Sequence, residues 1–556
     1  MLIGLDVGGT NIDAIIIRDG KIINKVKSPL YGKELLDSIL DTLDRLLEGY
    51  EKSQIKRVNL STTICTNAIV KNEISSVGML IQSGPGLPTK GLSCGNANHF
   101  LAGSIDHRGR VTEDLDADEI SQAIKEFKDK KIDHCAVVTK FSTRNPKVEI
   151  KIKDMLDEHF DFITTGHSIS GKLNFPRRVY TSYLNSAVYS TFKDFADKIE
   201  ESFARQGINA PIYILKADGG TMDLNSARQK PVESILSGPA ASFMGMEALL
   251  PIDGDSIFLD IGGTTTDIFF LVNGSPLFEE EGIKIDRYKT LVRSIYSVSI
   301  GLGGDSRIKI EDGKLEIGPD KEARPYCQGG ENPTPTDAML ALGLMEDGDW
   351  ERARYIMDDM GRRLNKSGDD MANLILDTMG DIIKDKIDSL LEEINSKPVY
   401  TVKEVLYSKK VRPEYINIIG GPAKSLAAVL ERKLGLTCNF PRNYHIANAV
   451  GAGLAKATLD ITLMADTEQG FITIPELNIH ENIKGEYSLQ MAKEQAVSLL
   501  VNHINLLDNE LRITEKDIEI TEESSFNMVD GFYTRGQNIR VEAQVKPGLI
   551  HTLRSE

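Results

Sequence analysis

Two segments of the chain carry the same succession of residue types, and that succession suits phosphate binding. Each segment has an Asp at the end of an apolar run, then two glycines, then hydroxyl or amide side chains, and then a second Asp. Glycines allow backbone N–H groups to approach phosphate oxygens because no Cβ intervenes. The segments read Asp6-Val7-Gly8-Gly9-Thr10-Asn11-Ile12-Asp13 and Asp260-Ile261-Gly262-Gly263-Thr264-Thr265-Thr266-Asp267.

The polar groups of the two segments have different expected roles. The Asp at each strand end, Asp6 or Asp260, is a candidate to hold Mg²⁺, which takes one or two carboxylates together with phosphate and water. These two residues and Asp267 are the candidate catalytic residues. The remaining positions are candidate nucleotide ligands: Gly8, Gly9, Thr10, Asn11, Asp13, Gly262, Gly263, Thr264 and Thr265.

A single segment of this kind would favour a structural role. Asp beside glycine is common in tight turns, where the carboxylate accepts N–H groups of the turn. Two near-identical copies, far apart in the sequence, favour phosphate binding instead. We therefore expect Mg²⁺-dependent ATP binding, with one loop on each side of the terminal phosphates and two similar domains that face a cleft.

A third glycine-rich segment follows an apolar run and precedes a predicted helix. It reads Gly420-Gly421-Pro422-Ala423, and its first two residues are candidates to let a nucleotide base and ribose lie flat on the backbone. On its own it would be read as an ordinary strand-to-helix turn. The G-x-x-x-x-G-K-[ST] loop is absent, which disfavours a P-loop NTPase. Two phosphate loops followed by an adenosine turn, in this order, resemble the actin/hexokinase/Hsp70 ATPase superfamily.

The elements that must position these loops can be read from hydrophobic periodicity. The clearest helix is predicted over 184–206, where large apolar residues recur every three or four positions and Gly207 follows as a C-cap. Strands are predicted at 2–7, 211–216 and 415–419, a strand–turn–strand at 257–272, and helices at 115–131, 336–345, 349–363, 370–394 and 424–434. The small residues of 447–453 suit a close crossing of two helices.

The expected fold is therefore an α/β fold of the actin-like ATPase type, two related α/β domains with a nucleotide cleft, plus a C-terminal α+β subdomain. The expected divisions are 1–175 for the first half, 176–250 for a connecting segment, 251–465 for the second half and 466–556 for the C-terminal subdomain.

Further segments resemble the ATP-handling, A-type subunit of the hydantoinase/oxoprolinase family over roughly residues 1–460. The order of these segments matches the family, and within the superfamily the Thr-x-x-x-Thr-Asn-Ala and Ser-Gly-Pro-Ala patterns are fairly specific to it. They are Ser61-Thr62-Thr63 with Thr66-Asn67-Ala68, Phe141-Ser142 with Asn145-Pro146, Arg178 with Thr181 and Tyr183, Asp218-Gly219-Gly220, Ser237-Gly238-Pro239-Ala240-Ala241, Gly301-Leu302-Gly303-Gly304-Asp305-Ser306, and Thr336-Asp337-Ala338. Gly303 and Gly304 join the candidate nucleotide ligands.

The first phosphate loop departs from the family pattern. The family's Gly-Gly-Thr-Phe-Thr-Asp is replaced by Gly-Gly-Thr-Asn-Ile-Asp, in which Asn11 is similar to sugar kinases. The family's Gly-Arg-Gln segment is also absent, and the region reads Cys94-Gly95-Asn96-Ala97-Asn98-His99. These departures concern the substrate more than the ATP chemistry.

The resemblance implies ATP-dependent hydrolysis of a cyclic amide, hydantoin-like or oxoproline-like, through phosphorylation of the carbonyl oxygen. It also implies a second large subunit of the hydantoinase B type and an oligomeric assembly. Three alternatives stay open: a small-molecule kinase of the sugar type, an ATP-dependent ketone carboxylase subunit, and a nucleotide-dependent switch or filament.

Substrate-binding candidates lie in the N-terminal half, where the γ-phosphate is expected to point. Hydroxyl and amide groups suit a neutral cyclic amide, and a histidine can transfer protons near neutral pH. The candidates are Thr63, Asn67, His99 and His107. The spacing His99-x6-Asp106-His107 is also a candidate for a further divalent metal, with an ordinary surface loop as the alternative.

Bulk composition narrows the setting. The net charge of −17 argues against nucleic acid or an anionic membrane as the main partner, since a phosphate backbone requires a cationic face. No apolar run reaches the length of about 18 residues that a membrane helix needs. The five cysteines never form a CxxC pair, which is typical of a reduced, cytoplasmic protein.

Overall fold

The computed structural model describes residues 1–9, 11–30, 34–279, 281–311, 313–322, 324–396, 410–508, 511–530 and 532–554. Thr10, a predicted phosphate ligand, lies outside these residues. The chain forms two compact units: unit 1 contains 1–240, 279–294 and 452–556, and unit 2 contains 241–278 and 295–451. In the part of the chain that the model describes, no helix is long and apolar enough to cross a membrane.

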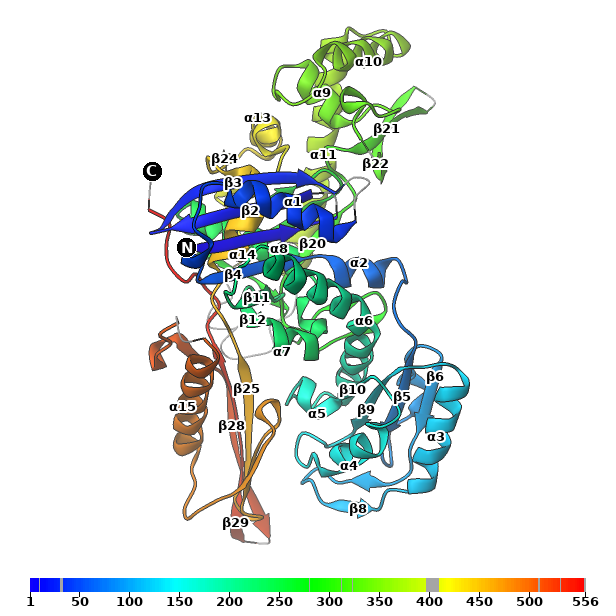
Figure 1. Ribbon diagram of the computed structural model, residues 1–556, viewed down its shortest axis with the longest axis vertical. Coiled ribbons are helices and arrows are strands. Elements are labelled where there is room, and N and C mark those ends of the chain that lie inside the picture. Colours follow the sequence, from blue (N-terminus) through cyan, green and yellow to red (C-terminus); the bar gives the residue numbers. More distant parts are fainter. Residues whose placement is uncertain are drawn as a thin grey trace. The chain divides into compact units, whose positions relative to one another are not determined.

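Unit 1 is built on three sheets, of which the first carries the N-terminal loop. Its strand order is β12-β11-β4-β1-β2-β3, with β1, β2 and β3 antiparallel and β1, β4 and β11 parallel. Helices α1 and α6 pack beside it (Figure 1). The strands and helices are β1 (Leu2–Val7), β2 (Asn11–Arg18), β3 (Lys21–Pro29), β4 (Arg57–Thr62), β11 (Ile212–Leu215), β12 (Thr221–Asp223), α1 (Leu35–Leu47), α2 (Ile64–Val70), α6 (Phe175–Arg205) and α7 (Leu224–Gln229).

Helix α6 is the long helix that periodicity predicts over 184–206, but it begins nine residues earlier. The early start has a local cause: the Asn174 side chain accepts a hydrogen bond from the Arg177 backbone N–H, and Pro176 occupies the first turn. The helix ends as predicted, since Gly207 takes a left-handed φ of 69°. Its apolar stripe, which includes Phe192 and Phe195, is fully buried.

The second sheet of unit 1 is parallel throughout, in the order β10-β9-β5-β6, and has its own apolar core with α3 and α4 (Figure 1). A small β7–β8 hairpin adjoins it. The elements are β5 (Val77–Gln82), β6 (Ala97–Phe100), β7 (Ser104–Ile105), β8 (Val111–Glu113), α3 (Ala117–Asp129), β9 (His134–Thr139), α4 (Lys147–Leu156), β10 (Phe162–Thr165) and α5 (Gly166–Ile169).

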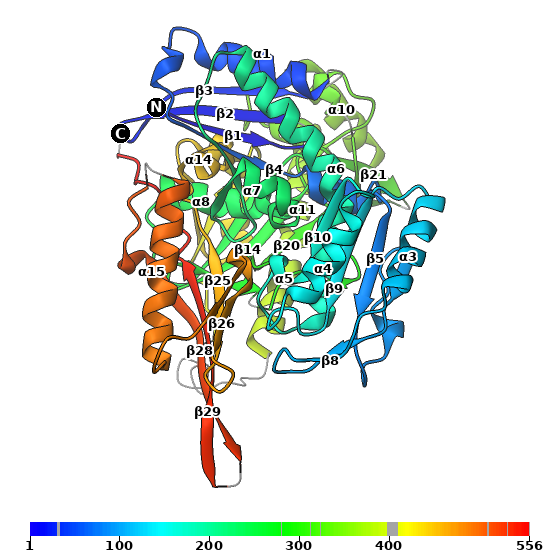
Figure 2. The same cartoon turned by 60° about the horizontal axis from the view of Figure 1, so that its bottom comes forward.

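The third sheet of unit 1 lies in the C-terminal part of the chain, where an α+β subdomain is expected. It is antiparallel in the order β27-β26-β25-β29-β28, and α15 packs along it (Figure 2). Its core joins Leu463, Val541 and Leu500, one from each of β25, β29 and α15. The elements are β25 (Asp460–Asp466), β26 (Phe471–Ile474), β27 (Ile479–Asn482), α15 (Leu489–Leu507), β28 (Ile518–Asp530) and β29 (Tyr533–Val545).

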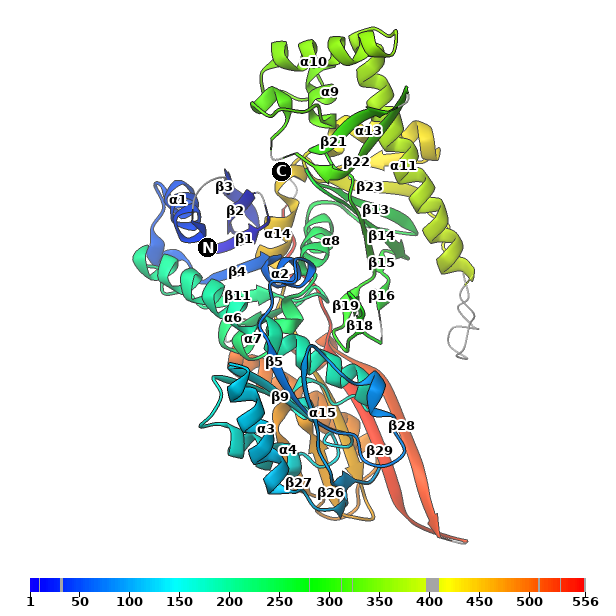
Figure 3. The same cartoon turned by 90° about the vertical axis from the view of Figure 1, so that its right-hand side faces the viewer.

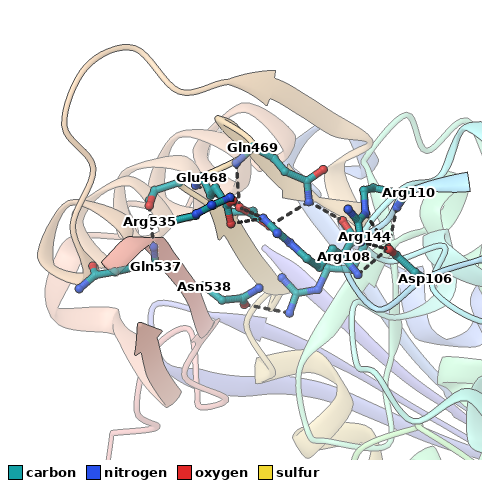
Figure 4. A network of polar contacts seen from close by, with 11 residues as sticks. Asp106, Arg108, Arg110, Arg144, Glu468, Gln469, Arg535, Gln537 and Asn538 are labelled. Atoms are coloured by element: carbon teal, nitrogen blue, oxygen red, sulfur yellow. Dashed lines mark hydrogen bonds and ion pairs between the residues drawn. The ribbon is translucent and has the colours of Figure 1, made fainter. Parts of the chain in front are cut away.

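A polar network joins the second and third sheets within unit 1 (Figure 4). The Arg108 guanidinium donates to both carboxylate oxygens of Asp466 at 3.0–3.1 Å and forms an ion pair with Glu468 at 2.9 Å. Arg144 Nη2 donates to Asn538 Oδ1 at 3.0 Å. The C-terminal sheet is thereby tied to the N-terminal part of the chain.

Two neighbouring arginines at the start of α6 hold backbone rather than a ligand. Arg177 Nη1 donates to the carbonyls of Glu281, Gly282 and Thr290, and so holds residues 279–294 on unit 1. Arg178 is fully buried and donates to the carbonyls of Thr139, Lys140 and Lys172. Both guanidinium groups are therefore engaged in structural contacts. The hairpin held by Arg177 contains β17 (Lys284–Ile285) and β18 (Tyr288–Lys289).

The main sheet of unit 2 has the order β15-β14-β13-β23-β24 with β20 beside β14, a separate hairpin is formed by β21 and β22, and a helical layer completes the unit (Figure 3). The predicted strand–turn–strand is the β13–β14 pair. The elements are β13 (Ser256–Ile261), β14 (Thr266–Val272), β15 (Ser275–Pro276), β20 (Ser297–Ile300), β21 (Ser306–Glu311), β22 (Lys314–Lys321), α9 (Pro335–Ala341), α10 (Trp350–Arg363), α11 (Gly368–Ser396), β23 (Tyr415–Ile419), α13 (Ala423–Leu434) and β24 (Thr437–Asn439), with the short β16 (Phe278–Glu279) and β19 (Ser294–Ile295) at its ends.

Helices α8 (Ser237–Leu249) and α14 (Ala447–Leu454) cross at glycine contacts inside unit 2. A Cβ on Gly451 would lie 2.0 Å from the Ala241 carbonyl oxygen, and a Cβ on Gly245 would lie 2.0 Å from the Ala447 carbonyl oxygen. Only hydrogen fits at these positions. The close crossing that the small residues of 447–453 predict is confirmed.

We expect Gly451→Ala to destabilise the protein, because the added methyl group cannot be accommodated without shifting backbone. Overpacking of this kind costs about 1–3 kcal/mol or more, although Ala favours a helix intrinsically. Thermal unfolding measures the effect, and Gly91→Ala is the matched control because nothing lies within 4 Å of its Cβ position. Equal unfolding temperatures for the two variants would contradict the tight crossing.

Candidate functional site

The two predicted phosphate loops are closed by the same backbone hydrogen bond in their respective units. In unit 2 the antiparallel pairing of β13 with β14 ends at the pair Ile261–Thr266. Beyond it, the Gly262 N–H donates to the Thr265 carbonyl at 2.9 Å. In unit 1 the last pair is Val7 with Ile12, and the Gly8 N–H donates to the Asn11 carbonyl at 3.1 Å. The repeat seen in the sequence is thus a repeat of structure.

The two aspartates of each loop are direct cross-strand partners. Asp260 pairs with Asp267, and Asp6 pairs with Asp13. Directly opposed residues project on the same face of a sheet, so each loop carries two carboxylates side by side. In unit 1 both have protein partners: Asp6 accepts from Ser61 Oγ at 2.5 Å, and Asp13 forms an ion pair with Lys27 at 3.0 Å.

In unit 2 the second carboxylate of the pair is strongly perturbed. Burial, together with the neighbouring charge of Asp260, raises the pKa of Asp267 from 3.8 to about 7, against a hydrogen bond from Ser299 that lowers it. A carboxyl group that gains and loses a proton near neutral pH suits acid–base chemistry.

Asp260 lies where three elements of unit 2 meet. Its Oδ2 accepts hydrogen bonds from Ser242 Oγ of α8 at 2.6 Å and from Asn448 Nδ2 of α14 at 3.2 Å. A Cβ on Gly420 would lie 2.8 Å from Asp260 Oδ1 and 2.2 Å from the Ile261 carbonyl oxygen. Gly420 has a φ of 95°, so glycine is required there for two reasons.

A second glycine turn lies on the loop of unit 2. The Gly304 N–H donates to the Gly262 carbonyl at 3.0 Å, and the Asp305 N–H donates to the Gly263 carbonyl at 2.5 Å. A Cβ on Gly303 would lie 2.6 Å from the backbone of Gly263. The predicted nucleotide ligands Gly303 and Gly304 are therefore packed directly against the predicted phosphate loop.

The third glycine turn completes this arrangement. A Cβ on Gly304 would lie 3.1 Å from Pro422 Cγ, so the turn before α13 reaches the same place. Gly421 has open space around it, with nothing within 4 Å of its Cβ position. The three glycine turns, 262–263, 303–304 and 420–421, lie next to the Asp260 carboxylate. Together they form a site that fits the phosphates and the cation of a nucleotide.

The predicted substrate residues Thr63 and Asn67 lie beside the loop of unit 1. Asn67 Nδ2 donates to Thr63 Oγ1 at 3.2 Å and lies 3.8 Å from the Cβ position of Gly9. The Thr63 methyl group lies 3.6 Å from the Cβ position of Gly238, so two segments that carry the family resemblance meet here. The backbone of Leu236, next to this contact, is in the left-handed region at φ 61°.

The two predicted histidines lie outside the first sheet of unit 1. His99 is on the edge strand β6, with its Nδ1 3.7 Å from Glu126 Oε2, and His107 is exposed in the β7–β8 turn. Asp106 accepts from the Arg108 and Arg110 backbone N–H groups and from Arg110 Nε. Among the described residues, no three His, Cys, Asp or Glu side chains are grouped to hold a metal ion.

Several residues of the unit 2 site were not predicted as functional. Ser242 and Asn448 are donors to Asp260, Asp305 lies on the loop, and the Thr336 hydroxyl donates to the Gly304 carbonyl at 2.9 Å. The sequence signal for them is weak, because Asp305 and Thr336 lie in segments whose only distinguishing feature is their resemblance to the family.

Comparison with known proteins settles the family. The model of the hydantoinase/oxoprolinase N-terminal region matches residues 2–160, and the hydantoinase/oxoprolinase model matches residues 178–461. The chain belongs to the hydantoinase/oxoprolinase family.

Proteins similar to this chain in sequence include enzymes with different substrates. The chain is 27% identical over 385 residues to caprolactamase subunit alpha of Pseudomonas jessenii, with 62% of this chain and 55% of the relative covered. It is 23% identical over 394 residues to acetophenone carboxylase gamma subunit of Aromatoleum aromaticum, with 62% and 53% covered. The chain therefore spans about half the length of these relatives.

Two solved structures share the fold. A nucleotide-free structure of acetone carboxylase superposes with a TM-score of 0.71 at 14% identity, covering 100% of this chain and 88% of the other. The ATP-dependent caprolactamase of Pseudomonas jessenii superposes with a TM-score of 0.67 at 19% identity, covering 98% and 87%. The expected α/β fold is confirmed, and the chain shares it with both of these proteins.

We expect Asp267→Asn to change stability in a pH-dependent way. A carboxyl whose pKa rises from 3.8 to about 7 on folding favours the native state below pH 4, and that contribution is lost as the pH rises through 7. At pH 8 the variant should melt about 1–3 °C above the wild type. The gain should shrink toward pH 4, and a pH-independent difference would contradict the raised pKa.

Proposed function

We propose that this chain is the ATP-handling subunit of an enzyme that hydrolyses a cyclic amide. The observation that carries the proposal is the convergence of three glycine turns on Asp260 and its loop in unit 2. Membership of the hydantoinase/oxoprolinase family supports ATP-dependent ring opening. One relative is named a caprolactamase subunit and another, in Arabidopsis thaliana, 5-oxoprolinase 1 (24% identical over 380 residues, covering 63% of this chain and 29% of the relative).

In this proposal the unit 2 loop binds the phosphates of ATP. The backbone N–H groups around Gly262 and Gly263 and the hydroxyls of Thr264 and Thr265 are the donors, and Gly420-Gly421 faces the adenosine. The corresponding residues of unit 1, Gly8, Gly9, Asn11 and Asp13, form the second phosphate-binding loop. Asp260 and Asp6 are the carboxylates that would hold Mg²⁺, which neutralises phosphate charge when bound.

The chemistry follows from the poor reactivity of an amide. The amide oxygen attacks the γ-phosphorus and ADP leaves, which places a good leaving group on the carbonyl carbon. Water adds to that carbon, and the ring C–N bond breaks as the nitrogen takes a proton. A second water attacks the same carbon, and phosphate departs with the original carbonyl oxygen. The protein supplies position and charge complementarity.

Thr63 and Asn67 are the proposed substrate-binding residues. Their hydroxyl and amide groups lie next to Gly9 of the unit 1 loop and suit the polar edge of a neutral cyclic amide. We further propose a second large subunit of the hydantoinase B type, because relatives are named as subunits of larger enzymes.

The function is tested by assaying the chain, with and without its co-purified partner, on lactams, hydantoins and 5-oxoproline. We expect Mg²⁺-dependent ADP release in equal amount to ring-opened acid. A stable phosphorylated product would instead indicate a kinase, and ATP consumption that requires a ketone and bicarbonate would indicate a carboxylase. Either result would overturn the proposed reaction.

We expect Asp260→Asn to lower turnover at least about 100-fold, as removal of a single preorganised electrostatic group does in other enzymes. The amide keeps the size of the side chain and can still accept from Ser242. Steady-state ATP hydrolysis measures the loss, and the exposed Asp320→Asn is the charge-matched control. Normal turnover in the Asp260 variant would remove this residue from the mechanism.

We expect Asn67→Ala to lose substrate-stimulated ATP hydrolysis and to keep basal hydrolysis, because Asn67 lies at the loop without belonging to it. His99→Ala and His107→Ala, made in parallel, test the remaining substrate predictions. Full stimulation in the Asn67 variant would place the substrate elsewhere, and full stimulation in both histidine variants would remove them from the site.

A further inference from the structure

The carboxylate of Asp305 is held against the proposed phosphate loop of unit 2. Its Oδ2 lies only 2.4 Å from the place where a Cβ on Gly263 would be, so it covers one side of that glycine. The position is fixed from the backbone, because the Asp305 N–H donates to the Gly263 carbonyl at 2.5 Å. Oδ1 accepts from the Thr336 hydroxyl at 3.4 Å.

The charge of Asp305 is not neutralised by an ion pair in the described part of the chain, although Lys321 acts on it and lowers its pKa. Among the described residues, no Lys, Arg or His side chain forms an ion pair with Asp305. Burial raises the pKa of Asp305 from 3.8 to about 6 and the nearby Asp337 adds to the shift, against the hydrogen bond from Thr336 and the charge of Lys321, which lower it. A negative group thus lies on a loop whose backbone otherwise suits an anion.

This placement has a consequence for the ligand. Free ATP brings several negative charges to the loop and meets a like charge in a partly dehydrated setting, where repulsion is stronger than in water. A magnesium complex of ATP brings a lower charge, and its bound waters can donate to a carboxylate. In this arrangement Asp305 would contact the magnesium complex through those waters.

We propose that Asp305 makes the phosphate loop selective for magnesium-complexed nucleotide over the free nucleotide. Asp305 is a specificity-determining residue in this role and need not touch the reacting atoms. The inference rests on the proposed binding of ATP at this loop and adds the form in which the nucleotide is accepted.

The test is calorimetric titration with a non-hydrolysable ATP analogue, once with Mg²⁺ and once with a chelator. The quantity measured is the dissociation constant of the free analogue divided by the dissociation constant of its Mg²⁺ complex. We expect Asp305→Asn to lower this ratio at least about tenfold, mainly by tighter binding of the free analogue, because removal of one like charge relieves its repulsion. Asp305→Glu should largely restore the wild-type ratio, and Asp320→Asn should leave it unchanged.

A purely structural role for Asp305 predicts a different result. Loss of loop geometry would weaken both forms of the analogue together and leave their ratio unchanged, which would overturn the inference. If Asp305→Asn does not fold, Asp305→Ser provides the same comparison with a smaller uncharged side chain. If the wild type binds neither form, the proposed ATP site itself fails, and that outcome is distinct from an unchanged ratio.

Discussion

The hydrogen-bonded carboxylate of Asp260 is the interaction on which the proposed nucleotide site depends. It ends β13, and its Oδ2 accepts from α8 through Ser242 and from α14 through Asn448. The two helices are locked against each other by glycine contacts that leave no room for a methyl group. The loop that follows Asp260 is therefore carried on rigid elements, which is what preorganised binding of phosphate requires. The same carboxylate is both an anchor of the fold and the proposed ligand of Mg²⁺.

The sequence predicted the parts of this site that are local. The duplicated loops and the turn at Gly420 follow short apolar strands, so residue types at fixed spacing were sufficient to find them. Ser242, Asn448 and Asp305 come from segments far from the Asp260 loop in sequence, and their roles arise only when the helices cross and the second glycine turn folds onto Gly263. Hydrophobic periodicity does not reveal side-chain contacts between segments that are separate in the sequence. Thr10 is predicted from the same local pattern and stays a prediction.

Charged side chains were the least predictable from sequence. Arg177 and Arg178 have the composition of an anion site, yet both donate to backbone carbonyls. Arg177 holds residues 279–294, which leave the strands of unit 2 and join unit 1. His99 lies on β6 of the second sheet and His107 in the β7–β8 turn, so their role as substrate-binding residues stays a prediction. Sequence patterns thus predicted the fold class and the chemistry of the loops. They did not predict which groups each charged side chain contacts.

The central claim is that the carbonyl oxygen of the substrate is phosphorylated by ATP at this site. Its most direct test is to give the enzyme, with its partner, a cyclic amide labelled with ¹⁸O at the carbonyl and to analyse the inorganic phosphate by mass spectrometry. Phosphorylation of the carbonyl oxygen followed by attack of water at carbon predicts one ¹⁸O atom in each phosphate released by ring opening. Unlabelled phosphate, with all of the label in the ring-opened acid, would contradict phosphorylation followed by attack of water at carbon.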